Sequence, residues 1–154
     1  MAEDTQRFDT FFSFGSNEGD RERNIRSAVQ LLETAIGQKL TLSSIIETEA
    51  DGFDGNDFLN CVGRCTFPDA GQSPLLHCTR LLHICKDIER KLGREVRPPR
   101  FNPDGSRLYS NRPIDIDILL YGDVRIDSGE LTVPHPRMHK RPFVMVPLEE
   151  IIHI

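Results

Sequence analysis

The stretch Arg112-Pro113-Ile114-Asp115-Ile116-Asp117-Ile118-Leu119-Leu120-Tyr121 decides the fold of this chain, because it reads as a β-branched strand that carries two carboxylates. The two-residue period of a strand places Asp115 and Asp117 on one face and the isoleucines on the other. Their Cβ atoms would lie about 6.5 to 7 Å apart at a rise of about 3.3 Å per residue, so both carboxylates could bind cations in one shared site. We therefore expect a Mg²⁺ site here. An isolated Asp-x-Asp is more often an edge strand whose polar face meets water or forms salt bridges, so the rest of the chain must decide.

Upstream of this strand, strand and helix patterns alternate. Asp20 can cap a helix whose apolar residues recur at helical spacing until Gly37, and Ser73-Pro74 begins a second apolar stripe that ends at Gly93. A tight turn is expected at Gly15-Ser16-Asn17. The resulting prediction is strands over 8–14, 40–47 and 58–67, a loop over 49–57, and helices over 21–36 and 74–92.

The order of these elements is strand, helix, strand, strand, helix, strand. It predicts an α+β fold of the ferredoxin-like βαββαβ type, a sandwich with helices on one face of a mainly antiparallel sheet. Beyond Gly122 we expect a short hairpin-like segment and then a last helix over 142–151. With 154 residues, the chain fits a single domain over residues 1–154.

Composition narrows the class of partner. The net charge of -5 with 28% charged residues argues against a nucleic-acid or membrane-surface role, and we found no apolar run of membrane-spanning length. The polar N-terminus lacks an apolar signal region, so we expect a cytoplasmic monomer that acts on small molecules. The four cysteines form no Cys-x-x-Cys pair and are expected to be core thiols.

The segment from Arg90 to Arg112 holds seven basic and two acidic residues in this acidic chain. Residues 94–111 also contain three prolines and a glycine, and a loop of this length without secondary structure is often an active-site lid. Arg94 follows the second helix and Arg112 precedes the aspartate strand. Because guanidinium groups bind phosphate oxygens and Mg²⁺ joins carboxylates to phosphates, the combination points to a nucleoside triphosphate.

Other polar residues have weaker local signals. Asn60 shares a strand face with Phe58 and could hydrogen-bond the edge of a flat heterocycle, although an edge residue that bonds backbone is the simpler interpretation. Phe143 could stack on such a ring or belong to the core. His135 and His139 have the spacing of a zinc pair but no further ligand motif, and a phosphate contact from His135 is favoured. Glu89 is most simply a solvated charge or a charge of the capping turn.

Five short motifs occur in one order along the chain: Gly15-Ser16-Asn17, Asp57-Phe58-Leu59-Asn60, Leu92-Gly93-Arg94, Arg112-Pro113-Ile114-Asp115-Ile116-Asp117 and Val133-Pro134-His135-Pro136-Arg137-Met138. Together they strongly resemble the 6-hydroxymethyl-7,8-dihydropterin pyrophosphokinase family, from about Phe11 to Ile151. The resemblance implies a ferredoxin-like fold and the transfer of pyrophosphate from ATP to the pterin hydroxymethyl group, with release of AMP, in folate biosynthesis.

The resemblance also implies residue roles. Asp115 and Asp117 would bind two Mg²⁺ ions that bridge the ATP phosphates, and Arg94 and Arg112 would hold phosphates, with Arg112 near the transferred group. The remaining contacts to ATP would come from Glu89, Thr132, His135 and Arg141. The pterin would be bound by Thr48, Gly52, Phe58, Asn60 and Phe143.

Two other classes of protein share part of this pattern. A nucleotidyltransferase also uses Gly-Ser and paired aspartates, but there the two lie close in sequence, whereas Gly15 and Asp115 are far apart here. A ferredoxin-like RNA-binding module would need exposed paired aromatics and basic flanks on the sheet, where Asn60 and Cys61 stand instead. No side chain stands out as a general base.

Overall fold

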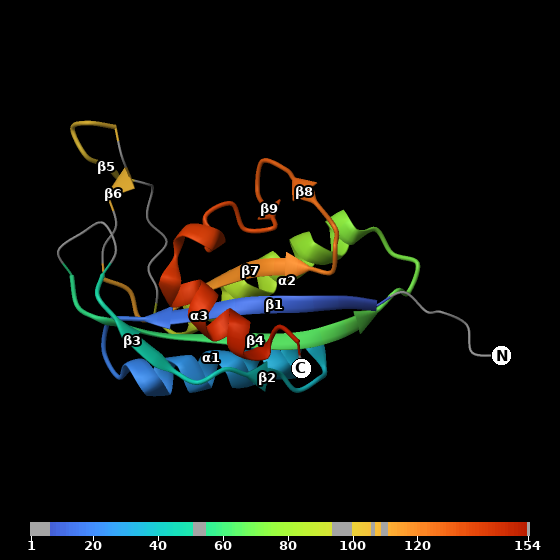
Figure 1. Ribbon diagram of the computed structural model, residues 1–154, viewed down its shortest axis with the longest axis horizontal. Coiled ribbons are helices and arrows are strands. Elements are labelled where there is room, and N and C mark those ends of the chain that lie inside the picture. The colour runs from blue at the N-terminus through green and yellow to red at the C-terminus, as the bar shows by residue number, and fades with distance from the viewer. Residues whose placement is uncertain (1–6, 51–54, 94–99, 106, 109–110, 154) are drawn as a thin grey trace.

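The computed structural model describes residues 7–50, 55–93, 100–105, 107–108 and 111–153. Its central sheet consists of the long strands β1 (Arg7–Ser16) and β4 (Phe58–Pro68), the strand β7 (Asp115–Tyr121), and the short strands β2 (Thr41–Leu42) and β3 (Ile46–Thr48). The order is β2-β4-β1-β7, β3 also pairs with β4, and every pairing is antiparallel. This is the predicted ferredoxin-like order, with the two long strands at its centre (Figure 1).

Two helices cover one face of the sheet. Helix α1 (Arg21–Ile36) has the predicted bounds: Asp20 accepts a hydrogen bond from the backbone N–H of Arg23, and Gly37 adopts the left-handed conformation, with a φ of 75°. Helix α2 (Pro74–Lys91) begins after Ser73, whose side chain accepts from the N–H of Leu76. Both ends of α1 and the start of α2 are therefore set by the caps read from the sequence.

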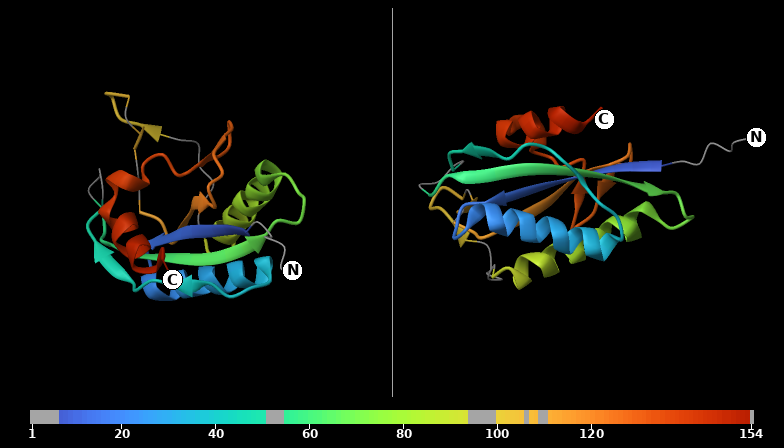
Figure 2. Two further views of the ribbon diagram at one scale, coloured as in Figure 1. Left: turned by 45° about the vertical axis from the view of Figure 1, so that its right-hand side comes forward. Right: turned by 90° about the horizontal axis from the view of Figure 1, so that it is seen from below.

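The helix α3 (Pro142–Ile151) lies on the opposite face of the sheet (Figure 2). The predicted arrangement, with helices on one face, therefore holds for α1 and α2, whereas no face was predicted for the last helix. It follows a 3₁₀ turn, η1 (Met138–Lys140), and packs through Val144, Leu148 and Ile151 against Phe11 and Val62 of the sheet. The chain thus has a core on each side of the sheet.

The larger core lies between the sheet and the helices α1 and α2. It contains three phenylalanines of β1, the isoleucines of β7, and all four cysteines, which are free and buried. Burial raises the pKa of each thiol, to about 12 for Cys65 and Cys78. The prediction of core thiols is confirmed.

Three local predictions need correction. The strand expected over 40–47 is two strands, because the Ser43 hydroxyl accepts from the Val62 N–H at 2.8 Å and interrupts the regular ladder. β1 continues through Ser16, so Gly15 and Ser16 belong to the strand and not to a turn. The basic segment is not structureless where it is described, because β5 (Arg100–Phe101) and β6 (Arg107–Leu108) form a small hairpin that projects from the body of the fold (Figure 1).

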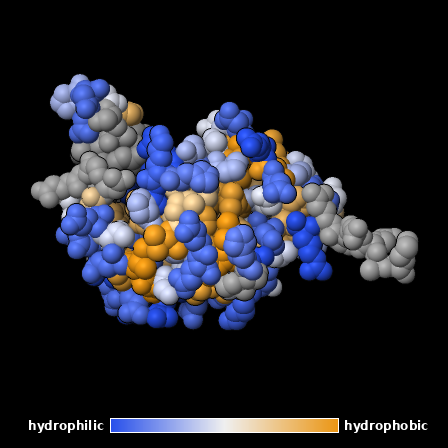
Figure 3. All heavy atoms as spheres, in the orientation of Figure 1, coloured by the Kyte–Doolittle hydropathy of each residue, from blue (hydrophilic) through white to orange (hydrophobic). Residues whose placement is uncertain are grey.

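The strands β8 (Ile126–Asp127) and β9 (Thr132–Val133) form the expected hairpin after Gly122. The exposed Glu130 of the intervening turn lies 2.6 Å from His83 of α2, which joins the hairpin to that helix. No helix within the described residues has both the length and the apolar composition that crossing a bilayer requires. The surface is largely polar, with apolar side chains gathered on the face that α3 occupies, where Val146 is 56% exposed (Figure 3).

Candidate active site

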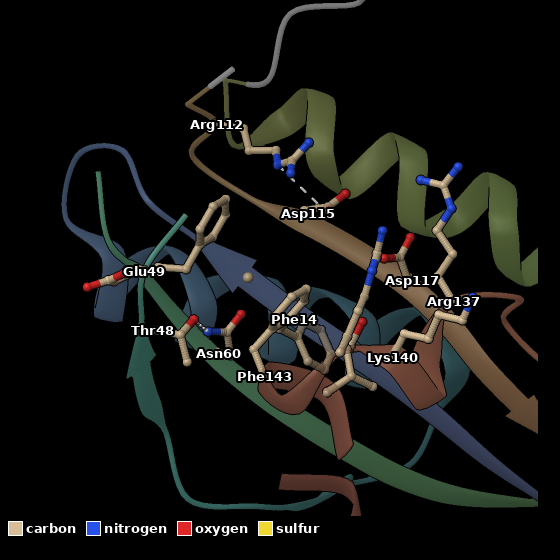
Figure 4. Close-up of a pocket in the computed structure, with 15 residues that line it drawn as sticks. Phe14, Thr48, Glu49, Asn60, Arg112, Asp115, Asp117, Arg137, Lys140 and Phe143 are labelled. Carbon is tan, nitrogen blue, oxygen red and sulfur yellow. Dashed lines mark hydrogen bonds and ion pairs between the residues drawn. The ribbon is translucent and has the colours of Figure 1, made fainter. Parts of the chain in front are cut away.

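A pocket of about 330 Å³ lies on the α3 face of the sheet, beside the beginning of that helix. It brings together eight of the residues singled out from the sequence: Thr48, Phe58, Asn60, Arg112, Asp115, Asp117, Arg141 and Phe143. They come from β3, from β4, from β7 with the segment that precedes it, and from the start of α3, so residues up to about a hundred positions apart share one cavity (Figure 4).

The two aspartates project into this pocket as the strand period predicts. On β7, Ile116 and Ile118 are 4% and 3% exposed in the core under the helices, whereas the side chains of Asp115 and Asp117 keep 28% and 34% of their exposure on the pocket face. The face assignment is therefore confirmed. Desolvation, followed by the charges of Asp115 and Glu89, raises the pKa of Asp117 to about 7. Negative charge is concentrated at this point of the strand.

Basic side chains surround the aspartates. The Arg112 Nε atom lies 3.9 Å from Asp115 Oδ2, and His135 Nε2 lies 4.0 Å from Asp117 Oδ2. Arg137, Lys140 and Arg141 also line the cavity. The result is a pair of carboxylates enclosed by guanidinium and ammonium groups, which is a suitable environment for a phosphate chain that carries a metal ion.

The other end of the pocket is mainly aromatic, and its polar residues are Asn60, Thr48 and Glu49 (Figure 4). The Asn60 side chain is buried, at 6% exposure, and its Nδ2 donates to Thr48 Oγ1 at 2.8 Å. Figure 4 shows its oxygen pointing toward the interior, with Phe143 beside it. The Phe58 ring lies 5.4 Å from the Arg112 guanidinium and the Phe143 ring 5.6 Å from that of Arg141, so each aromatic ring contacts a cation at the border of the two ends.

Gly15 forms part of the floor at the aromatic end. A Cβ at this position would lie 3.5 Å from Asn60 Oδ1 and 3.6 Å from the Phe58 ring, and would take up space between them. The lack of a side chain therefore keeps this part of the pocket open.

Three described residues that were predicted for the site, Glu89, Thr132 and His135, lie outside the lining of the pocket. Thr132 is exposed on β9, and His135 contacts the site only through its 4.0 Å approach to Asp117. Burial and the charge of Arg141 lower the pKa of His135. Arg94 and Gly52 fall outside the described residues.

Glu89 is the clearest correction. It is not a solvated charge, because it is 8% exposed and its Oε2 accepts a hydrogen bond from the backbone N–H of Ile116 at 2.8 Å. Among the described residues, β7 is the last strand of the central sheet, so this N–H points away from β1 and has no neighbouring strand as its acceptor. The carboxylate of Glu89 on α2 accepts this hydrogen bond in place of a neighbouring strand. It thereby fixes the backbone between the two aspartates.

Sequence reasoning missed several lining residues, namely Ser13, Phe14, Gly15, Glu49, Arg137, Lys140 and Val144. The density of basic residues between Arg137 and Arg141 was a usable signal for the cations. Nothing in the sequence marked Glu49, whose carboxylate points away from the two aspartates in Figure 4.

The chain is similar to several known proteins. A 2-amino-4-hydroxy-6-hydroxymethyldihydropteridine pyrophosphokinase of Porphyromonas gingivalis is 39% identical over 143 residues, covering 92% of this chain and 88% of its own. The enzyme of the same name from Bacillus subtilis is 38% identical, covering 92% of this chain and 76% of its own. The mitochondrial folate synthesis bifunctional protein of Pisum sativum is 37% identical over 150 residues, which are 96% of this chain and 26% of that protein. Residues 11–153 match the family described as 7,8-dihydro-6-hydroxymethylpterin-pyrophosphokinase, and the chain belongs to that family.

Proposed function

We propose that this pocket is where the chain, as an ATP-dependent pyrophosphokinase of folate biosynthesis, transfers pyrophosphate from ATP to 6-hydroxymethyl-7,8-dihydropterin and releases AMP. The observation that carries the proposal is the division of one cavity into an aromatic, amide-bearing end and a carboxylate and cation end. A flat heterocycle and a phosphate chain must meet in this reaction, and the two ends offer one environment to each.

At the aromatic end, Asn60 and Thr48 would hold the pterin edge while Phe58 and Phe143 enclose its ring. Support comes from the Asn60 amide, which Thr48 holds in one orientation at 2.8 Å. A buried amide that is already fixed costs little further ordering when it binds a planar donor and acceptor edge. Gly52 is proposed for the segment over the pterin, on the family resemblance alone.

At the charged end, Asp115 and Asp117 would hold two Mg²⁺ ions against the ATP phosphates. Within the described residues, no group of three or more His, Cys, Asp or Glu side chains is arranged to hold a metal by itself. The donor set still fits Mg²⁺, because this ion is commonly bound by one or two carboxylates, with substrate phosphates and water completing its six ligands. The raised pKa of Asp117 also indicates carboxylate charge that a cation would offset. When bound, the ions would reduce the charge on the bridging and leaving oxygens.

The cations have separate proposed tasks. Arg112, next to Phe58 and Asp115, would contact the transferred group, and Arg94 and Arg141 would hold the other phosphates, with Arg137 and Lys140 adding positive charge. Thr132, His135 and Glu89 would frame the nucleotide, Glu89 through the backbone of Ile116.

In the proposed reaction, the pterin hydroxymethyl oxygen attacks the β-phosphorus of ATP in line, and the bond from that phosphorus to the AMP oxygen breaks. The protein contributes mainly by positioning the two substrates and by stabilising charge on the phosphate oxygens. We assign no general base.

The test is a product analysis. The protein is incubated with Mg²⁺, ATP and 6-hydroxymethyl-7,8-dihydropterin, and AMP and the pterin diphosphate should accumulate in equal amounts. Release of ADP, or of free pyrophosphate as from a nucleotidyltransferase, would contradict the proposal. An EDTA sample restored by titration with Mg²⁺ tests the metal requirement separately.

We also propose that residues 1–154 act as a single domain and a monomer in the cytoplasm, on small molecules and without nucleic acid. The net charge of -5 supports the last point. Sedimentation of the active protein at a mass of 17.5 kDa is the expected result, and a stable dimer would contradict it.

A further inference from the structure

Asn17 lies directly after β1 and is 1% exposed, although its side chain is a polar amide. Both N–H groups and the oxygen of this amide form hydrogen bonds. The Oδ1 atom accepts from the backbone N–H of Arg112 at 2.7 Å, and Nδ2 donates to the backbone oxygen of Asn56 at 3.1 Å and to Asn111 Oδ1 at 2.8 Å. The residue therefore joins three segments that are 39 to 95 positions apart in the chain.

The first of these bonds fixes Arg112. In addition to the side-chain bond, the Asn17 N–H donates to the Arg112 backbone oxygen at 3.1 Å. Both backbone polar groups of Arg112 are thus bound to one residue, three positions before Asp115. The direction in which the Arg112 side chain leaves the backbone is set by this pair of bonds.

The remaining bonds fix the chain that leads into Phe58. Asn56 donates from its own side chain to the Asn17 backbone oxygen at 3.1 Å, and its backbone N–H donates to Asn111 Oδ1 at 3.1 Å. Asn111 Oδ1 thus accepts two hydrogen bonds, one from each of the other asparagines. Phe58, two residues after Asn56, is the ring over which the Arg112 guanidinium lies at 5.4 Å.

We propose that Asn17 is a positioning residue for pyrophosphate transfer, which holds Arg112 in a fixed place relative to the Phe58 segment through Asn56 and Asn111. This inference rests on the proposed role of Arg112. An amide suits the position because it supplies one acceptor and two donors, whereas a carboxylate lacks the donors and an alkyl side chain lacks all three. Asn17 lines none of the pocket itself, so it acts through Arg112 and the Phe58 segment.

The test uses Asn111 first, because its side chain is exposed and its loss endangers the fold least. Asn111→Ala removes the acceptor of two hydrogen bonds, whereas Asn111→Asp keeps an oxygen for both. We expect kcat to fall about tenfold or more in Asn111→Ala, with the melting temperature and the KM for ATP nearly unchanged, and to return to within about twofold of wild type in Asn111→Asp.

Asn17→Asp is the second variant, since it keeps the acceptor for Arg112 but loses both donors, and its kcat should fall at least as far as that of Asn111→Ala. The matched control is Asn24→Ala. Asn24 supports the same turn, because its side chain donates to the Glu18 backbone oxygen at 2.9 Å and to Ser16 Oγ at 3.4 Å. Among the described residues these bonds reach neither Arg112 nor Asn56, so the kcat of Asn24→Ala should equal that of wild type.

A double-mutant cycle separates this inference from the role of Arg112. If Asn17 acts through Arg112, Asn111→Ala should add less than about a twofold loss in an Arg112→Ala background, because the group it positions is absent. A normal kcat in both Asn111→Ala and Asn17→Asp overturns the inference, even if their melting temperatures fall. An unchanged kcat in Arg112→Ala alone overturns the proposed role of Arg112, and this inference with it.

Discussion

The two faces of the central sheet come from the same strands but are built differently. The face under α1 and α2 is mostly apolar, with Phe12 and Ile114 fully buried. The opposite face is apolar only under α3, through Phe11, Val62 and Leu119, and becomes a charged pocket beyond the first turn of that helix. One face should therefore carry the stability of the fold and the other its chemistry, and substitutions on each can test this separation.

The largest effect is expected from Asp117→Ala on the pocket face. It should abolish pyrophosphate transfer, because one of the two proposed metal ligands is lost, while the melting temperature stays close to that of wild type. Measurement of AMP release and thermal unfolding on the same preparation checks both points. Asp127→Ala, which removes an exposed strand aspartate outside the pocket, is the control and should retain activity. Near-normal transfer by Asp117→Ala would remove the basis for the metal assignment.

Phe12→Ala on the other face should have the reverse effect. The side chain is 0% exposed in the core under the helices, so its loss should lower the free energy of unfolding by about 3 to 5 kcal/mol. The KM for each substrate should be unchanged in the fraction that remains folded at low temperature. Urea unfolding gives the stability, and Phe101→Ala, at a ring that is 64% exposed, is the control. A stable Phe12→Ala protein with altered KM would contradict the separation of the faces.

A smaller effect is expected from Asn60→Ala, which compares the two ends of the pocket and not the two faces of the sheet. Loss of the amide should raise the pterin KM by a factor that corresponds to about 1 to 3 kcal/mol, because the pterin edge and Thr48 lose a buried partner. The KM for ATP should not change, since Asn60 is at the aromatic end of the pocket, away from Asp115 and Asp117. Steady-state kinetics with each substrate varied in turn is the measurement. Equal increases in both KM values would mean that the two ends of the pocket do not act separately.

The smallest expected effect is a gain in stability. In EDTA, Asp117→Asn should raise the free energy of unfolding, because the pKa of Asp117 is raised in the folded chain and its ionised form is therefore destabilising at neutral pH. Since about a third of the side chain is exposed, we expect at most about 1 kcal/mol, or roughly 2 to 4 °C in melting temperature. When Mg²⁺ and a non-hydrolysable ATP analogue are added, the wild-type protein should become more stable than Asp117→Asn. A variant that is less stable than wild type in EDTA would show that the carboxylate is stabilising without a ligand.

A feature of the fold could be predicted from the sequence where it depends on residues that are close together in the chain, and not where it depends on residues that are far apart. The bounds of α1 and the alternating faces of β7 were predictable, because caps and the two-residue period are properties of neighbouring residues. The split of the second strand was not, since it depends on a hydrogen bond between Ser43 and Val62. The burial of Glu89 was also missed. It results from the packing of α2 against the outer edge of β7, and no pattern within α2 encodes that edge.

The same distinction between local patterns and interactions of distant segments holds for the candidate site. Asp115, Asp117 and Asn60 could be placed on their strand faces from local alternation, and the ordered motifs identified the family. The role of Asn17 could not be found in this way, because its partners Asn56 and Asn111 become neighbours only when β1, β4 and β7 align.

The reactivity of the four buried cysteines can report on the opening of the core between the sheet and the helices α1 and α2. All of them lie on the helix-covered side, two on β4 and two on α2, so a thiol reagent reaches them only when that core separates. Their pKa values are raised by burial, which keeps them unreactive in the closed state. Alkylation rates in the native protein would therefore show whether a ligand in the pocket, on the far side of the sheet, slows the opening of α2.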